Sequence, residues 1–144
     1  GRAKAVAGDY EAALADSNHA VELDNANIYN FLNRADVYRM TGEREKALAD
    51  LEKSQEIDAK NPYIYKMRGE IYSEMGEKEA ALAAYKEYWK QAPDVRDIPD
   101  EYMQEVDAAA YDKIVKEREQ KEKEKKEQAE GKKDASEKKV GEKA

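Results

Sequence analysis

Three glycines, Gly8, Gly42 and Gly76, stand 34 residues apart in a chain of 144 residues, and a similar phrase follows each of them. Each phrase places a glutamate three residues after the glycine and ends in an alanine followed by a leucine. A fixed period of this length is typical of stacked helical or strand units, which bury their apolar faces against their neighbours rather than in one central core. Such arrays present a binding surface more often than a catalytic cleft.

The composition suits a thin array better than a large core. Charged residues make up 41% of the chain, the mean hydropathy is −1.09, and there is one Phe and one Trp. Paired helices that each bury one stripe of side chains need less apolar material. No run of about 18 apolar residues occurs, so we expect no membrane insertion by this segment. The absence of cysteine excludes a disulfide framework.

The two complete units each predict a pair of helices. Large side chains recur at three- and four-residue steps in 28–41, and Gly42 supplies the permissive backbone that ends this first helix. A return helix is predicted at about 44–57. The same order recurs around Gly76, so the sequence predicts an all-α chain of helix-turn-helix units.

The first unit is incomplete in the sequence. Only Arg2 to Ala7 precede the turn expected at Gly8, and a helix that short is marginal. We therefore expect a truncated repeat made mainly of a helix over 9–24. We also expect the natural protein to continue N-terminally, with any targeting information there, so the compartment stays unknown.

Within each complete unit an aromatic residue is followed by a small residue, a tyrosine, the turn glycine and an alanine at fixed steps. The members are Phe31, Ala35, Tyr38, Gly42 and Ala47, and then Tyr65, Gly69, Tyr72, Gly76 and Ala81. This pattern resembles the tetratricopeptide repeat (TPR) family over roughly 1–95. The resemblance implies a right-handed α-solenoid. Arg34 and Arg68 depart from the family pattern, because each replaces the usual apolar residue before the small one.

The period fails after Pro93. A new helix is predicted from about Pro99, with Asp97 as a possible cap. Its apolar stripe is expected to cover the exposed end of the last repeat. The predicted organisation is a truncated repeat over 1–27, repeats over 28–61 and 62–95, a capping helix region over 96–115, and a charged extension over 116–144.

The extension carries charge without an apolar seam. Pairs such as Glu117 with Lys121 lie four residues apart in the favourable order, which predicts a solvated helix over 116–128. The composition beyond Gly131 predicts disorder. Lysines and glutamates are interleaved here, whereas residues 1–115 hold 15 basic and 24 acidic residues, so we expect no nucleic-acid partner.

Residues for catalysis are scarce. The one histidine, His19, lies one helical turn after Asp16, but a metal site needs three or four convergent ligands. A second acidic cluster lacks the ligand spacing of a calcium loop, and caps or turns explain it more simply. Its members are Asp94, Asp97, Asp100 and Glu101. No phosphate loop or nucleophile motif is present. We expect a chain that is not an enzyme and holds no cofactor or metal.

The resemblance implies that the first helices of successive units line a concave face that holds a peptide or partner helix. Carried over by position, this face presents Tyr29, Leu32, Asn33, Asp36, Arg39, Met40, Tyr63, Lys66, Met67, Glu70, Ser73 and Glu74. Aromatic and methionine side chains beside charges suit a mixed ligand. Glu70 and Glu74 favour a ligand with some positive charge. The alternative is that Tyr29 and Tyr63 only shield helix starts and the charges form a solvated face.

Three functions remain open from the sequence. The leading hypothesis is a protein–protein interaction scaffold, the C-terminal part of a longer repeat protein of bacterial type. In the second, the groove is filled by the chain's own 99–115 helix or by another copy, which makes the segment an end-cap or a self-association element. In the third, the chain is an accessory domain of an enzyme encoded upstream.

Overall fold

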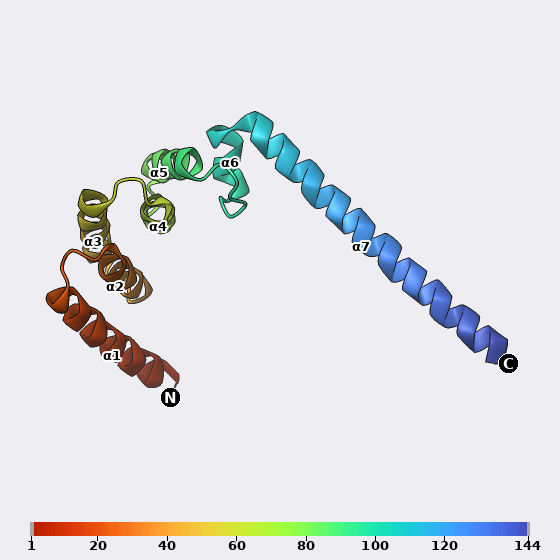
Figure 1. Cartoon of the computed structure of the whole chain (residues 1–144), viewed down its shortest axis with the longest axis horizontal. Coiled ribbons are helices and arrows are strands. Elements are labelled where there is room, and N and C mark those ends of the chain that lie inside the picture. The colour runs from red at the N-terminus through yellow and green to blue at the C-terminus, as the bar shows by residue number, and fades with distance from the viewer. Residues whose placement is uncertain (1, 144) are drawn as a thin grey trace.

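The computed structural model describes residues 2–143, and side chains for residues 8–133. Every element in this part of the chain is an α-helix (Figure 1). In Figure 1 the helices form an arch in which α2 and α4 lie on the inner side and α3 and α5 on the outer side. The helices are α1 (Arg2–Leu23), α2 (Ile28–Met40), α3 (Arg44–Ile57), α4 (Pro62–Glu74), α5 (Lys78–Gln91), α6 (Asp100–Val106) and α7 (Ala108–Lys143).

The turns within the two complete units are those that the sequence predicts. Gly42 and Gly76 adopt φ angles of 82° and 77°, a left-handed conformation that side chains disfavour. In both turns the backbone N–H three residues past the helix end bonds back five residues, from Glu43 to Tyr38 at 2.8 Å and equivalently at 2.9 Å in the next unit. This is the Schellman arrangement, which satisfies carbonyls at the helix end and reverses the chain.

The first helices of both units begin in the same way. Asn27 and Asn61 lie in extended conformation, and the side-chain oxygen of each accepts a hydrogen bond of 3.0 Å from the backbone N–H two residues on. Asparagine is a favoured N-cap because its oxygen satisfies one of the N–H groups left free at a helix start. Pro62 follows directly, where its missing N–H costs nothing.

The turn expected at Gly8 is wrong. Helix α1 runs unbroken from Arg2 to Leu23, and a Cβ added at Gly8 would meet nothing within 4 Å. A turn at this glycine would break helical hydrogen bonds, and the six residues Arg2 to Ala7 would bury too little apolar surface to compensate. A glycine inside a helix costs only about 1 kcal/mol relative to alanine, so the helix continues.

The single helix expected over 99–115 is also wrong, because the chain breaks at Asp107. This residue adopts φ −160° and ψ 98°, and its Oδ1 accepts a 3.1 Å hydrogen bond from the backbone N–H of Ala110, which caps the start of α7. Pro99, not Asp97, precedes α6, and no side chain caps that helix. The apolar residues of α6 and those in the first part of α7 therefore reach the same core from two different helices.

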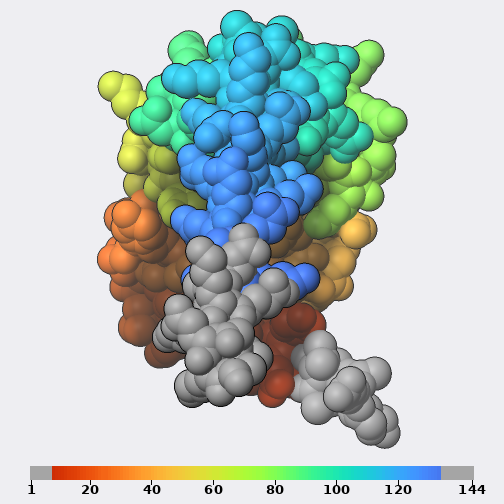
Figure 2. Space-filling view, turned by 90° about the vertical axis from the view of Figure 1, so that its right-hand side faces the viewer, coloured from red at the N-terminus to blue at the C-terminus, as the bar shows by residue number. Residues whose placement is uncertain are grey.

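Beyond Gly131 the backbone remains helical as far as Lys143, so the disorder expected there is not confirmed. The Glu, Lys and Ala residues of this segment have high helix propensity and no proline interrupts them. Figure 2 shows the surface of α7 leaving that of α6, and Figure 1 shows that α7 then projects away from the repeats.

The core runs continuously through the repeats and into the C-terminal helices. Leu51, Ile64 and Ile71 are fully buried, and Tyr102 of α6 and Ile114 of α7 belong to the same cluster. α6 therefore covers the end of the last repeat, and the ring of Tyr102 lies 5.0 Å from that of Tyr85.

Helix α4 lies close to a side chain of α5 at Gly69. A Cβ added to Gly69 would lie 2.6 Å from the ring of Tyr85, closer than real Cβ contacts come. The equivalent positions in the preceding repeat hold Ala35 and Leu51, both fully buried. The repeat with the smaller residue on its first helix, Gly69, thus has the larger residue, Tyr85, on its second helix.

We predict that Gly69→Ala lowers the free energy of unfolding by about 1–3 kcal/mol, because overpacking outweighs the better helix propensity of alanine. In a Tyr85→Leu background the same substitution should cost little, since it recreates the Ala–Leu pair of the preceding repeat. Urea unfolding followed by circular dichroism measures both. An equal loss of stability in the two backgrounds would contradict this account.

Candidate functional site

The predicted binding residues lie along α2 and α4, the inner helices of the arch (Figure 1). Tyr29, Met40 and Tyr63 expose 63, 52 and 56% of their surface, which is unusual for large apolar side chains. Leu32, by contrast, is buried in the core, and Met67 packs against the core. The accessible residues of the predicted set are therefore mostly polar, and Tyr29, Met40 and Tyr63 are the large exposed side chains among them.

An ion-pair network joins the two inner helices. Arg39 of α2 contacts Glu70 at 2.5 Å and Glu74 at 3.6 Å on α4, and Asp36 at 3.5 Å on its own helix. Glu74 also contacts Arg44 at 3.2 Å. Three carboxylates thus surround two guanidinium groups, which leaves one excess negative charge at this point of the face. Asn33, on the same helix as Arg39, is exposed.

The chain's own linker and α6 occupy the other part of this face. Lys66 contacts Asp97 at 2.9 Å, and Asp97 also accepts a 2.8 Å hydrogen bond from the hydroxyl of Tyr88. The hydroxyl of Tyr102 lies 3.1 Å from that of Ser73. Lys66 and Ser73 therefore already have partners within the chain.

Sequence analysis missed the role of Asp97 at this face, whereas it left open that the segment 99–115, which contains Tyr102, fills the groove. Asp97 was expected to cap a helix, and its spacing contains no signal that it reaches α4. Tyr88 is the one available clue, because the resemblance places a small residue there. Its larger side chain meets the linker instead of another ordinary repeat.

The pKa of Asp97 is lowered from its ordinary value. Burial alone raises this pKa, but the hydrogen bonds from Lys66 and Tyr88, the positive charge of Lys66 and a backbone hydrogen bond together outweigh the burial and favour the carboxylate. The same contact with Asp97 raises the pKa of Lys66. Linker and inner helix are thus held by an interaction that depends on an ionised carboxylate.

The other candidates from the sequence do not form a site. His19 is exposed on α1. In the described part of the chain, no three His, Asp or Glu side chains converge as metal ligands. None of the described helices combines the length and the apolar character that crossing a membrane requires.

Antiparallel helix pairs stacked every 34 residues define a helical-repeat solenoid. The tetratricopeptide repeat model matches residues 29–61 and 63–94, which are the pairs α2–α3 and α4–α5 with their linkers. These two helix pairs are tetratricopeptide repeats, as the sequence pattern predicts. Among curated protein sequences, none matches the chain significantly.

Solved structures with the same fold include proteins from a plant and a bacterium. The TPR domain of Arabidopsis OM64 is 22% identical with a TM-score of 0.59, over 80% of this chain and 88% of that one. A thermophilic TPR protein of Thermus thermophilus is 29% identical with a TM-score of 0.58, over 75% of this chain and 50% of that one. PcrH, in complex with the chaperone binding region of PopD, is 16% identical with a TM-score of 0.57, over 80% and 85%. The bacterial type expected from the sequence stays a prediction.

We predict that Asp97→Asn lowers the Tm at pH 7 and that the difference shrinks at low pH. Because the folded-state pKa is depressed, the stability that Asp97 contributes is present above its unfolded pKa of about 3.9 and is lost as the pH falls through the folded value. Thermal unfolding at about pH 7 and pH 2.5 measures this. Asp94→Asn, an exposed neighbour on the same linker, is the control and should change neither Tm. A difference that persists unchanged at low pH would contradict the role of the carboxylate.

Proposed function

We propose that this chain is a protein–protein interaction scaffold whose inner face binds a peptide or partner helix of cationic character. The observation that carries the proposal is the exposure of Tyr29, Met40 and Tyr63 beside an acidic network on two adjoining helices. Exposed aromatic side chains are frequent anchors of interfaces, because they bury much area with little loss of conformational freedom.

The contacts of the linker narrow the proposed site. Lys66 and Ser73 are engaged by Asp97 and Tyr102, so the ligand is proposed to lie on the α2 side of the face. The accessible groups there are Tyr29, Asn33, Asp36, Met40, Tyr63 and Glu74. Asp36 and Glu74 belong to the network that holds one carboxylate more than it holds guanidinium groups, and this excess supports a ligand carrying lysine or arginine.

The neighbours support an interaction role without specifying a ligand. The structure of PcrH contains a segment of another protein, the chaperone binding region of PopD. At 16% identity this neighbour supports only the expectation that a fold of this shape accommodates a partner segment. The proposal assigns no catalytic role to the chain.

A second candidate function is that the segment ends an array and its groove is closed by the chain itself. The contacts of Asp97 with Lys66 and of Tyr102 with Ser73 favour it, because both come from the region expected to cap the repeats. The two candidates differ in whether the α2 side of the face binds anything.

We predict that Tyr29→Ala with Tyr63→Ala weakens partner binding at least about tenfold, a loss of about 1.4 kcal/mol, because both anchors are removed. Affinity capture from the source cell's lysate, read by mass spectrometry, identifies the ligand, and titration of that ligand gives the affinities. Leu23→Ala is the control, since Leu23 is a 74% exposed apolar residue of α1 that is not among the predicted face residues.

Identical captures by the parent and the double variant would contradict the proposed binding face and favour the closed-groove alternative. A second comparison tests the charge. A basic version of the identified peptide should bind more tightly than its acidic version, and equal affinities would remove the basis for a cationic ligand.

A further inference from the structure

The two complete repeats hold equivalent arginines, Arg34 and Arg68, directly before Ala35 and Gly69. Arg34 is fully partnered within the chain. Its Nη2 and Nε donate to the two carboxylate oxygens of Asp50 at 2.6 and 2.8 Å, and its Nη1 donates to the side chain of Asn18 at 3.2 Å. Asp50 is only 4% exposed, so this two-point contact ties α2 to α3 inside the structure and also reaches α1.

Arg68 stands one repeat later without that carboxylate. The position equivalent to Asp50 is Ala84, because Asp50 and Ala84 are 34 residues apart. Among the described side chains, no carboxylate lies within 4.0 Å of the Arg68 guanidinium. The guanidinium lies over the ring of Tyr65 at 5.7 Å from its centre. The half-buried guanidinium of Arg68 therefore makes no ion pair with a described side chain.

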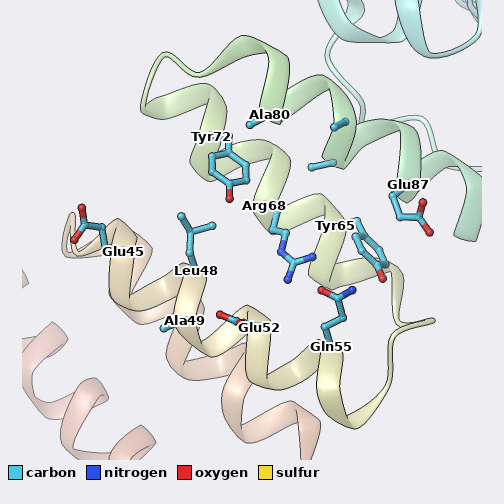
Figure 3. A pocket seen from close by; sticks show the side chains of 12 residues that line it. Glu45, Leu48, Ala49, Glu52, Gln55, Tyr65, Arg68, Tyr72, Ala80 and Glu87 are labelled. Atoms are coloured by element: carbon cyan, nitrogen blue, oxygen red, sulfur yellow. The ribbon is translucent and has the colours of Figure 1, made fainter.

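Arg68 faces a groove of about 630 Å³ between α3 and α5 (Figure 3). Tyr65, Arg68 and Tyr72 of α4 line it between the two outer helices. Ala80, Ala83 and Ala84 form the α5 wall, and their small side chains leave room for a partner's side chain. This groove lies between the outer helices of the arch, away from the concave face proposed above.

Charge complementarity indicates what the groove accepts. An arginine fork matches a carboxylate in two-point contact, and the Arg34–Asp50 pair shows that this site in the repeat holds one. Three carboxylates also line the groove, Glu45 and Glu52 on the α3 wall and Glu87 on the α5 wall. They suit a basic side chain near that carboxylate in the same partner segment.

We propose that this outer groove binds a partner segment through an aspartate or glutamate side chain, which Arg68 holds as Arg34 holds Asp50. A lysine or arginine close to that acid in the partner segment pairs with Glu52 or Glu87. Because position 84 is an alanine, α5 supplies no carboxylate to Arg68, and the partner's carboxylate approaches the guanidinium from the groove. The proposal concerns a surface separate from the concave face and does not depend on it.

The geometry of the site is tested by supplying the missing carboxylate from within. Ala84→Asp should lower the Tm far more in an Arg68→Gln background than in the parent, because only Arg68 can compensate the buried charge. Lys86→Asp, at an exposed position of α5 outside the groove lining, should change the Tm equally in both backgrounds. Equal effects of Ala84→Asp in the two backgrounds would overturn the proposal.

Binding is tested with a phage-displayed library of random peptides, about 16 residues long to span the groove at roughly 3.3 Å per extended residue, selected on the full chain. We expect a class of selected peptides that carry Asp or Glu with Lys or Arg close by in the sequence. These peptides should bind Arg68→Gln and Ala84→Asp at least about tenfold more weakly, the second because the introduced aspartate occupies Arg68.

Their affinity for the Tyr29→Ala/Tyr63→Ala variant should be unchanged, which separates this groove from the concave face. The proposal is overturned if no selected peptide loses affinity with Arg68→Gln. It is also overturned if the peptides that do so contain no acid. If the peptides lose affinity for the Tyr29→Ala/Tyr63→Ala variant but not for Arg68→Gln, they bind the concave face and the proposed outer site is overturned.

Discussion

The close approach of the two helices within each repeat is the contact on which the remaining structure depends. Gly69 of α4 lies against Tyr85 of α5, and the equivalent positions of the preceding repeat hold Ala35 and Leu51, both buried in the same core. A larger side chain at either small position would separate the helices by its own width, because packed interiors leave little free volume. The left-handed turn glycines make this approach possible by reversing the chain within a short turn.

The packed helix pairs present charged residues on two different surfaces, the inner face and the outer side of the array. The inner helices place Arg39 among carboxylates of the next repeat, and that contact joins neighbouring units. The outer side contains equivalent arginines, of which Arg34 is satisfied by Asp50 and Arg68 is not. A repeat protein can therefore keep a structural ion pair in one unit and expose its counterpart in the next through one change in a neighbouring residue.

The sequence predicted the repeated part well and the ends poorly. Gly42 and Gly76 have a local conformational reason to end helices, so their turns follow from residue type alone. Gly8 has the same residue type but no helix to turn toward, and it stays inside α1. Asp107 ends α6, and its side chain caps the start of α7. Asp97, the expected cap, instead contacts Lys66 and Tyr88.

The sequence by itself determined the helix pairs, their period, their turns and the family, because these depend on neighbouring residues and on a pattern repeated every 34 positions. It also placed the candidate inner-face residues on the right helices. Only the tertiary structure decided that Leu32 is buried, that Lys66 and Ser73 are engaged by the linker and α6, and that Arg68 lacks a carboxylate. These outcomes depend on contacts between segments far apart in the sequence, whose geometry no local pattern encodes.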